Sequence, residues 1–354
     1  MRRIQTEQIK GGEILGKDIY NSSGAVLISS GTVLKKEYGE HLKGLRVSDI
    51  FVEDNISKDI HADDITEEKI SSQCTMELQN TIERFSYAAD AELRQLTHVA
   101  QDVMKGVLEQ KEVVYNISNV RSYSRSLYEH CLSVGALSTL IAIHSGYGEK
   151  ATNEIAIGAL LHDIGFMSIN ADYQQLLLEE AEEKIQKEIK RHVLYGYSVV
   201  EHQDWLSNIS KDIILYHHER LDGTGYPFHM RGKSVCPEVK LVALCDAFDS
   251  MVYGNLQKRM KVYEAMEYIV GTSGTKFDRG LVNLFVNSVA AYPIGTIVSL
   301  SNGERGIVIR QNKQTPTRPI VSILECNEDG GWERTMERDL IEELTLFIVD
   351  TIEE

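Results

Sequence analysis

Residues 217–227 read His217-His218-Glu219-Arg220-Leu221-Asp222-Gly223-Thr224-Gly225-Tyr226-Pro227, and they follow an apolar helical run at 209–216. Ile209, Ile213 and His217 recur every four residues, which places them on one helix face. His217 is therefore expected to point into the core, where a buried imidazole needs partners. Taken alone, the two histidines fit either a helix end with ordinary hydrogen bonds or part of a metal site.

Further residues of ligand type recur along the chain, at intervals of about 25 to 32 residues. The series comprises His130, His162, Asp163, His192, His217, His218 and Asp246. Val239, Val242, Asp246 and Asp249 are spaced so that both aspartates continue an apolar helix face. Because carboxylates are rarely buried unless they are paired or bind a metal, we expect the series to converge on one interior metal site.

Several short motifs in a fixed order resemble the HD-GYP branch of the HD metal-dependent phosphohydrolases. They are His130, Leu161-His162-Asp163-Ile164-Gly165, His192, His217-His218-Glu219, Gly223-Thr224-Gly225-Tyr226-Pro227, Asp246-Ala247-Phe248-Asp249 and Gly274-Thr275-Lys276-Phe277-Asp278. The resemblance covers roughly residues 115–290, about half of the chain. It implies a helical bundle that hydrolyses cyclic di-GMP to pGpG and sometimes GMP, with cyclic GMP-AMP as a variant substrate.

The resemblance also implies two divalent transition-metal ions, Fe or Mn, with Zn as an alternative. One ion would be held by His130, His162, Asp163 and Asp246, and the other by Asp163, His192, His217 and His218. Asp163 would be the bridging, catalytic carboxylate. Asp249 is expected either to act catalytically, on the attacking water or a proton, or to accept a hydrogen bond behind a ligand. A third metal is not expected, because Ser126 stands where three-metal members carry a glutamate.

The substrate-contacting positions match the family less well than the ligands do. The resemblance assigns substrate binding to Gly225, Tyr226 and Pro227, with Arg231 and Lys258 as nearby cations. Phe166 replaces the usual lysine, Phe228-His229 the usual Arg-Gly, and Asn255-Leu256-Gln257 the usual Arg-Pro-Tyr. Each lost charge-assisted contact is worth about 1.5–3 kcal/mol.

Two functional hypotheses follow from this contrast. The first is a metal-dependent cyclic dinucleotide phosphodiesterase, which the intact ligand series favours. The second is a catalytically weak signalling module that binds a cyclic dinucleotide, or binds a protein partner through the Gly-Tyr-Pro loop. The altered positions Phe166, Phe228 and Asn255 favour the second.

The chain is expected to be multidomain and mainly α, with an all-helical HD-GYP bundle between small β-rich terminal domains. The expected boundaries are 1–58 for the N-terminal domain, 59–112 for a helical linker or stalk, 113–290 for the catalytic domain and 291–354 for the C-terminal domain. Strands are predicted at 25–28, 32–34 and 49–53, in a hairpin at 295–310 around Asn302-Gly303, and at 319–324 and 345–349. Helical periodicity at 70–107 fits either packing onto the bundle or a homodimer seam.

Composition and charge exclude some classes of partner and indicate the cellular compartment. A net charge of −16 over 354 residues argues against a nucleic-acid polymer or an anionic membrane as partner. A small phosphodiester is compatible with this charge, because bound metals reverse the local field. Five scattered cysteines without a Cys-x-x-Cys motif indicate reduced thiols, and no apolar run is long enough to span a membrane. A cytoplasmic role in bacterial second-messenger signalling is therefore expected.

Overall fold

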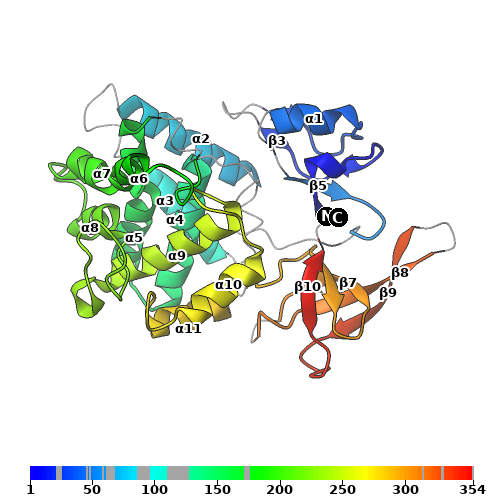
Figure 1. The fold of residues 1–354 in the computed structure, drawn as a ribbon. Helices are drawn as coiled ribbons and strands as arrows, with labels where there is room; N and C mark the ends of the chain where they lie inside the picture. Colours follow the sequence, from blue (N-terminus) through cyan, green and yellow to red (C-terminus); the bar gives the residue numbers. More distant parts are fainter. Residues whose placement is uncertain are drawn as a thin grey trace. The chain divides into compact units, whose positions relative to one another are not determined.

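The computed structural model describes residues 1–20, 26–44, 47, 49–57, 60, 68–85, 96–109, 127–170, 176–312, 315–327 and 331–352. The chain divides into two compact units (Figure 1). The β unit contains the described parts of Met1–Ser72 and Val286–Glu354, and the helical unit contains those of Gln73–Glu109 and Arg125–Phe285. The prediction of a mainly α, multidomain chain with small β-sheets in its terminal segments is confirmed.

The N-terminal part of the β unit is a small sheet with one helix. β5 (Asp49–Glu53) lies between β1 (Arg2–Gln5) and β2 (Ile14–Leu15), and both pairings are antiparallel. A separate pair joins β3 (Ile19–Tyr20) to β4 (Val26–Ile28), and the remaining elements are η1 (Thr6–Gln8) and α1 (Glu37–Gly44). The core contains Ile4, Leu15, Leu34, Leu42 and Val52.

The strand predicted at 25–28 is present as β4, whereas the strand predicted at 32–34 is wrong. β4 pairs with β3, the strand that precedes it in the chain, and Val33 forms only an isolated bridge with Ile14. The backbone N–H groups of Gly31 and Leu34 donate to the carbonyl oxygens of Leu15 and Glu13, both at 2.7 Å. The alternation of apolar residues correctly predicted an extended backbone, but it does not specify which strand is the partner.

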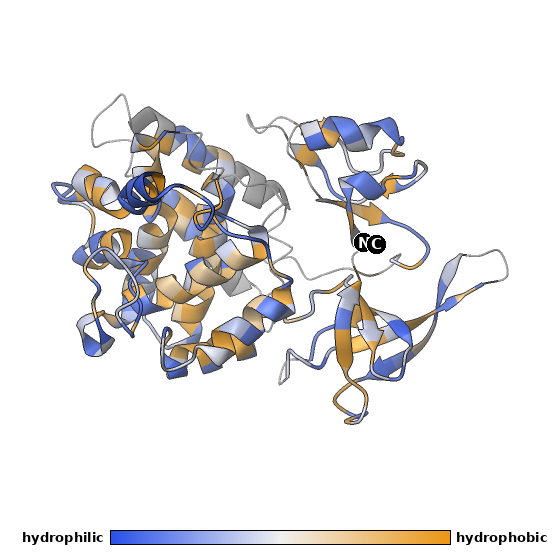
Figure 2. Cartoon of the chain, in the orientation of Figure 1, coloured by the Kyte–Doolittle hydropathy of each residue, from blue (hydrophilic) through white to orange (hydrophobic). Residues whose placement is uncertain are grey.

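The C-terminal part of the β unit is an antiparallel sheet in the order β10-β6-β7-β8-β9. Its strands are β6 (Ile297–Leu300), β7 (Arg305–Arg310), β8 (Ile320–Cys326), β9 (Trp332–Asp339) and β10 (Ile348–Ile352). The predicted hairpin is present, with Gly303 at φ +88° in its turn. β9 was missed, because it is mostly hydrophilic whereas β8 is mostly hydrophobic (Figure 2).

The two terminal segments share a hydrophobic core. Ile56 and Ile60 pack with Ile297, Ile307 and Leu324 of the C-terminal sheet. The N-terminal amine of Met1 donates to the carbonyl oxygens of Ser57 at 2.7 Å and Ile60 at 2.8 Å. The β unit is therefore built from both ends of the chain.

The helical unit is built around two helices that are buried along most of their length. These are α4 (Leu127–His144), in which residues 130–142 are buried, and α9 (Pro237–Tyr253). The other elements are α2 (Glu68–Phe85), α3 (Leu96–Glu109), α5 (Glu149–Leu161), η4 (Ile164–Ser168), α6 (Glu183–Lys190), α7 (His192–Val200), α8 (Asn208–Tyr216), η6 (Gly232–Ser234), α10 (Val262–Gly271) and α11 (Arg279–Ser288). α4 packs on α5 and α9, while α8 contacts α5, α7 and α9. A helix that is apolar on all sides must lie inside such a bundle.

The periodic segment at 70–107 corresponds to two helices, α2 and α3, and residues 86–95 between them lie outside the described part. Val99, Ala100 and Val103 of α3 are buried, and α3 contacts α4 and α5. These contacts support the packing alternative for α3. A homodimer through this segment stays a prediction.

Gly165 holds the turn after α5 tightly against α7. A Cβ atom at this position would lie far inside contact distance of the backbone of His192 and Gly196. Backbone atoms at a helix start cannot move aside without shifting the helix, so only glycine fits here.

Gly165→Ala should therefore lower the free energy of unfolding of the helical unit by about 3 kcal/mol or more, at or above the usual range for overpacking. Thermal unfolding followed by circular dichroism would measure this change. Gly271→Ala is the matched control, because a Cβ atom there meets nothing within 4 Å. Equal melting temperatures for both variants would contradict the close approach.

Candidate metal centre

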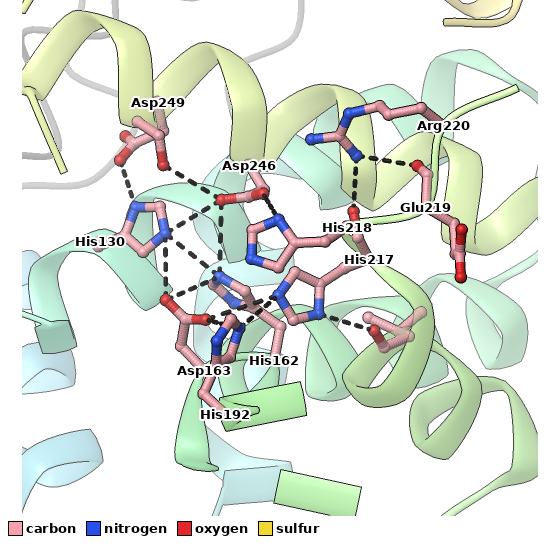
Figure 3. Close-up of polar contacts among 12 residues, drawn as sticks. His130, His162, Asp163, His192, His217, His218, Glu219, Arg220, Asp246 and Asp249 are labelled. Carbon is pink, nitrogen blue, oxygen red and sulfur yellow. Dashed lines mark hydrogen bonds and ion pairs between the residues drawn. The ribbon is translucent and has the colours of Figure 1, made fainter. Parts of the chain in front are cut away.

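The seven predicted ligands come from the ends and the middle of five helices and converge in one place (Figure 3). His130 lies in the first turn of α4, His162 and Asp163 follow α5, and His192 begins α7. His217 and His218 follow α8, and Asp246 lies within α9. Six of these residues are no more than 3% exposed, and the His218 side chain is 19% exposed. A single interior cluster thus contains the whole predicted series.

Three of the imidazoles are oriented by carbonyl groups at helix ends. His162 Nδ1 donates to Ala159 at 2.7 Å, His192 Nδ1 donates to Ile189 at 2.8 Å, and His217 Nδ1 contacts Ile213 and Ile214 at 3.1 and 3.2 Å. The last carbonyl groups of a helix have few partners within it, and each carbonyl oxygen has two lone pairs, so they can accept from an imidazole. Each of these hydrogen bonds leaves Nε2 as the atom that faces the centre.

The nitrogen and oxygen atoms that face the centre lie within hydrogen-bond distance of one another. His192 Nε2 lies 3.3 Å from His217 Nε2, and His130 Nε2 lies 3.2 Å from His162 Nε2. Asp163 Oδ1 lies 3.2 Å from His192 Nε2 and has no hydrogen-bond donor within the described part of the chain. Two lone pairs at this distance repel each other, whereas a cation bound by both would be stabilised.

Asp163 separates two ligand groups and belongs to both. Its Oδ1 faces His192 and His217 at 3.2 and 3.6 Å, and its Oδ2 faces His130 and His162 at 3.5 and 3.4 Å. The two groups that can hold a metal ion are Asp163, His192, His217 and His218, and His130, His162 and Asp163. Imidazole nitrogen and carboxylate oxygen are donors that suit Fe, Mn and Zn, so the residues present fit transition-metal ions.

Asp246 lies beside the second group. Its Oδ1 is 3.3 Å from His130 Nε2 and 3.9 Å from His162 Nε2, and it accepts from Ser250 Oγ at 3.3 Å. Its Oδ2 lies 3.6 Å from His218 Nδ1. Asp246 therefore faces atoms of both groups.

The protonation of the centre follows from burial and from its carboxylates. Burial lowers the pKa of His217 to about 4 and holds that of His218 well below its usual value, so both imidazoles are neutral, as ligation requires. Burial opposes ionisation of Asp163, but His162 outweighs it and holds the pKa of Asp163 well below its usual value. The carboxylates in turn outweigh burial at His130 and raise its pKa. His217, His218 and Asp163 are thus in the protonation states that metal ligation requires.

Asp249 lies behind His130, away from the converging atoms. Its Oδ2 accepts from His130 Nδ1 at 2.6 Å, its Oδ1 accepts from Ser133 Oγ, and the side chain is fully buried. This position supports the second alternative considered from the sequence, an acceptor that orients a ligand. A carboxylate behind an imidazole fixes the ring and raises its basicity.

Glu219 was not assigned a role from the sequence, although it follows the ligand pair directly. It is 2% exposed, and its Oε1 and Oε2 accept from the backbone N–H groups of Phe228 at 2.7 Å and Met230 at 2.9 Å. A buried carboxylate requires such donors. Its position in the sequence, directly after His218 and before the glycine loop, could have indicated that Glu219 has a role at the centre. Glu219 ties the far side of the loop to the helix that carries the ligands.

The loop places Tyr226 against the centre. The ring of Tyr226 stacks on His218 with centroids 4.6 Å apart and an interplanar angle of 27°. Gly225 is approached so closely by the backbone of residues 218–220 that no Cβ atom fits there. Two of the predicted substrate-binding residues, Gly225 and Tyr226, thus lie next to a ligand, and Pro227 follows them.

The two predicted cations Arg231 and Lys258 are exposed. The Arg231 side chain lies against Gly223, at the base of the loop. Their assignment as substrate-binding residues stays a prediction.

Phe166, which replaces the family lysine, is part of an apolar cluster. It is 3% exposed and packs with Ile169, Ile189 and Leu256. Its ring stacks on His192 with centroids 4.3 Å apart and an interplanar angle of 16°. The position therefore supports a ligand ring by packing and offers no polar atom to a substrate.

A helical bundle with an interior cluster of imidazoles and carboxylates defines a helical protein with a candidate metal site, and comparison with known families specifies the family. Residues 80–281 match the family described as the HD domain, and residues 297–354 match the KOW domain associated with the HD domain. The first match spans more than half of the chain. The chain therefore belongs to the HD domain family, and the family resemblance inferred from the motifs is confirmed.

The relatives extend this comparison. The chain is 26% identical over 229 residues to the cyclic di-GMP phosphodiesterase PA4108 of Pseudomonas aeruginosa, which covers 64% of this chain and 54% of the relative. It is 28% identical over 181 residues to the 3'3'-cGAMP-specific phosphodiesterase 2 of Vibrio cholerae, which covers 50% of this chain and 34% of the relative. The chain thus spans about half the length, or less, of these curated relatives.

A solved structure shares the fold. Bd1817, a HDG"Y"P protein from Bdellovibrio bacteriovorus, is similar with a TM-score of 0.54 at 19% identity, over 80% of this chain and 97% of that chain. Among the helices that the structure describes, none combines the length and hydropathy needed to cross a bilayer.

Removal of the Glu219 carboxylate should release the loop. Glu219→Ala removes two charge-assisted hydrogen bonds, each worth about 1.5–3 kcal/mol, so amide exchange at Phe228 and Met230 should accelerate at least about tenfold. Hydrogen exchange measured by mass spectrometry on peptides covering 223–231 reports this change. Glu201→Ala, at the exposed end of α7, is the control. Unchanged exchange in folded Glu219→Ala would mean that other contacts hold the loop.

Proposed function

We propose that this chain is a metal-dependent phosphodiesterase that hydrolyses a cyclic dinucleotide, with cyclic di-GMP as the first candidate substrate and pGpG or GMP as product. The observation that carries this proposal is the sharing of Asp163 between two ligand groups. A carboxylate shared in this way suits two ions about 3.5–4 Å apart, the spacing that two-metal phosphoryl-transfer sites use.

The residues that would hold the ions are those that the sequence indicated. His130, His162, Asp163 and Asp246 would hold one ion, and Asp163, His192, His217 and His218 the other. When bound, the ions would supply charge stabilisation at phosphorus and would activate water. Fe or Mn is proposed first, with Zn as the alternative, because all three accept this mixed donor set.

The remaining residues of the centre prepare it for this chemistry. The helix-end carbonyls keep Nε2 of three histidines directed inward, and Asp249 does the same for His130. Tyr226, stacked on His218, bounds the centre on the side of the loop. A preorganised centre of this kind needs little rearrangement when charge develops on a phosphate.

The choice of substrate rests on the relatives. One of them is named as a cyclic di-GMP phosphodiesterase and another as 3'3'-cGAMP-specific. Both molecules are cyclic dinucleotides, which supports the substrate class more strongly than either member of it.

A second candidate function is a catalytically weak signalling module that binds a cyclic dinucleotide or a protein partner. Two observations favour it. The family lysine is replaced by the buried Phe166, and Phe228, directly after the Tyr-Pro pair, is 57% exposed. An exposed aromatic ring on a loop that a carboxylate holds in place is a common feature of protein contacts.

Asp163→Ala should remove both metal ions, because the carboxylate belongs to both ligand groups. The unaltered protein, purified without oxygen, is expected to carry about two transition-metal ions per chain, as two-metal sites do. Elemental analysis measures both values, and Asp204→Ala, at an exposed aspartate, is the control. A full metal complement in Asp163→Ala would show that the residue is not shared.

Turnover separates the two candidate functions. The metal-loaded protein should convert cyclic di-GMP or 3'3'-cGAMP to linear products, and Asp246→Ala should reduce the rate to background because a ligand carboxylate is lost. Chromatography of the nucleotides gives the rates. Tight binding of either nucleotide by a fully metal-loaded protein that releases no product would establish the signalling module instead.

A further inference from the structure

A cyclic dinucleotide needs a cation for each of its two phosphates, and the position of the family lysine supplies none in this chain. A cyclic dinucleotide carries two phosphodiester groups, each with one negative charge. Metal ions at the centre would neutralise the phosphate that is cleaved, which leaves the other phosphate to be recognised by side chains. The position of the family lysine is occupied by Phe166, which is buried among apolar residues.

Arg220 follows His218 by two positions, but its guanidinium already binds the backbone. Nη1 donates to the carbonyl oxygens of His217 at 3.0 Å and Glu219 at 2.9 Å. The same group lies 5.3 Å from the centroid of the Phe277 ring. Arg220 therefore stabilises the loop and the chain end that follows α8.

Lys190, unlike Arg220, is a cation near the centre whose hydrogen-bond donors are available to a substrate. It is the last residue of α6, two positions before His192, and it is exposed. Its Nζ lies 5.6 Å from the centroid of Tyr226, the ring that stacks on His218. Within the described part of the chain it forms no ion pair, whereas Lys187 on the same helix pairs with Glu183 at 2.6 Å. The ammonium is thus held beside the centre by a ring and keeps its hydrogen-bond donors.

We propose that Lys190 is a substrate-binding residue that contacts the uncleaved phosphate of the cyclic dinucleotide. This assignment rests on the proposed function. Tyr226 lies beside both the ammonium and His218, so Lys190 is placed to reach a substrate group just outside the centre. A lysine is suited to this place because its ammonium is a compact charge on a flexible stem.

The test compares three variants of the metal-loaded full chain: Lys190→Gln, Lys190→Arg and the control Lys187→Gln. KM and kcat are measured for cyclic di-GMP and for bis(p-nitrophenyl) phosphate, a diester with a single phosphate. Lys190→Gln should raise KM for cyclic di-GMP roughly 10- to 100-fold, the loss expected for one charge-assisted contact. Hydrolysis of the single-phosphate diester and metal content should stay unchanged. Lys190→Arg should recover most of the affinity.

Two results would overturn the assignment. One is a KM for cyclic di-GMP in Lys190→Gln equal to that of Lys187→Gln. The other is an equal loss on both substrates, which would mean that Lys190 acts on the centre itself. Binding of a phosphorothioate analogue of cyclic di-GMP, measured by calorimetry, separates this question from turnover. If the chain binds the analogue without hydrolysing cyclic di-GMP, the phosphodiesterase proposal fails while Lys190 is still tested by the affinity.

Discussion

The hydrogen bonds from imidazole Nδ1 to the last carbonyl groups of α5, α6 and α8 are the interaction on which the centre depends. The carbonyl groups at a helix end need hydrogen-bond donors from outside the helix, and here the imidazole Nδ1 groups of the ligand residues provide them. The same bond that ends the helix therefore fixes which ring nitrogen faces inward. Helix length, helix packing and ligand geometry are coupled, because a shift of any of these helices would turn a ligand away from its partners.

Much of the centre could be predicted from the sequence, because its ligands are residue types that rarely lie on apolar helix faces without a purpose. His162, His217 and Asp246 each continue such a face, so periodicity alone directs them inward. The roles of Asp249 and Glu219 could not be predicted in this way. Both are buried carboxylates, and only the identity of the contacting atom, an imidazole for one and two backbone amides for the other, distinguishes a ligand from a support.

The β unit illustrates a different limit. Alternation of apolar residues identified β4 and the β6–β7 hairpin, because the turn at Asn302-Gly303 joins neighbours in sequence. Val33 was misassigned because its partner, Ile14, lies far back in the chain, and β9 was missed because an edge strand needs no apolar face. Phe166 was recognised as a departure, but its packing on His192 depends on residues from several elements.

The core that Ile56 and Ile60 share with Ile297, Ile307 and Leu324 joins chain segments that lie on either side of the helical unit in the sequence. The Met1 amine strengthens the β unit by donating to the carbonyl oxygens of Ser57 and Ile60. Loss of either chain end would uncover the apolar residues of the other. The two terminal modules are therefore interdependent in folding.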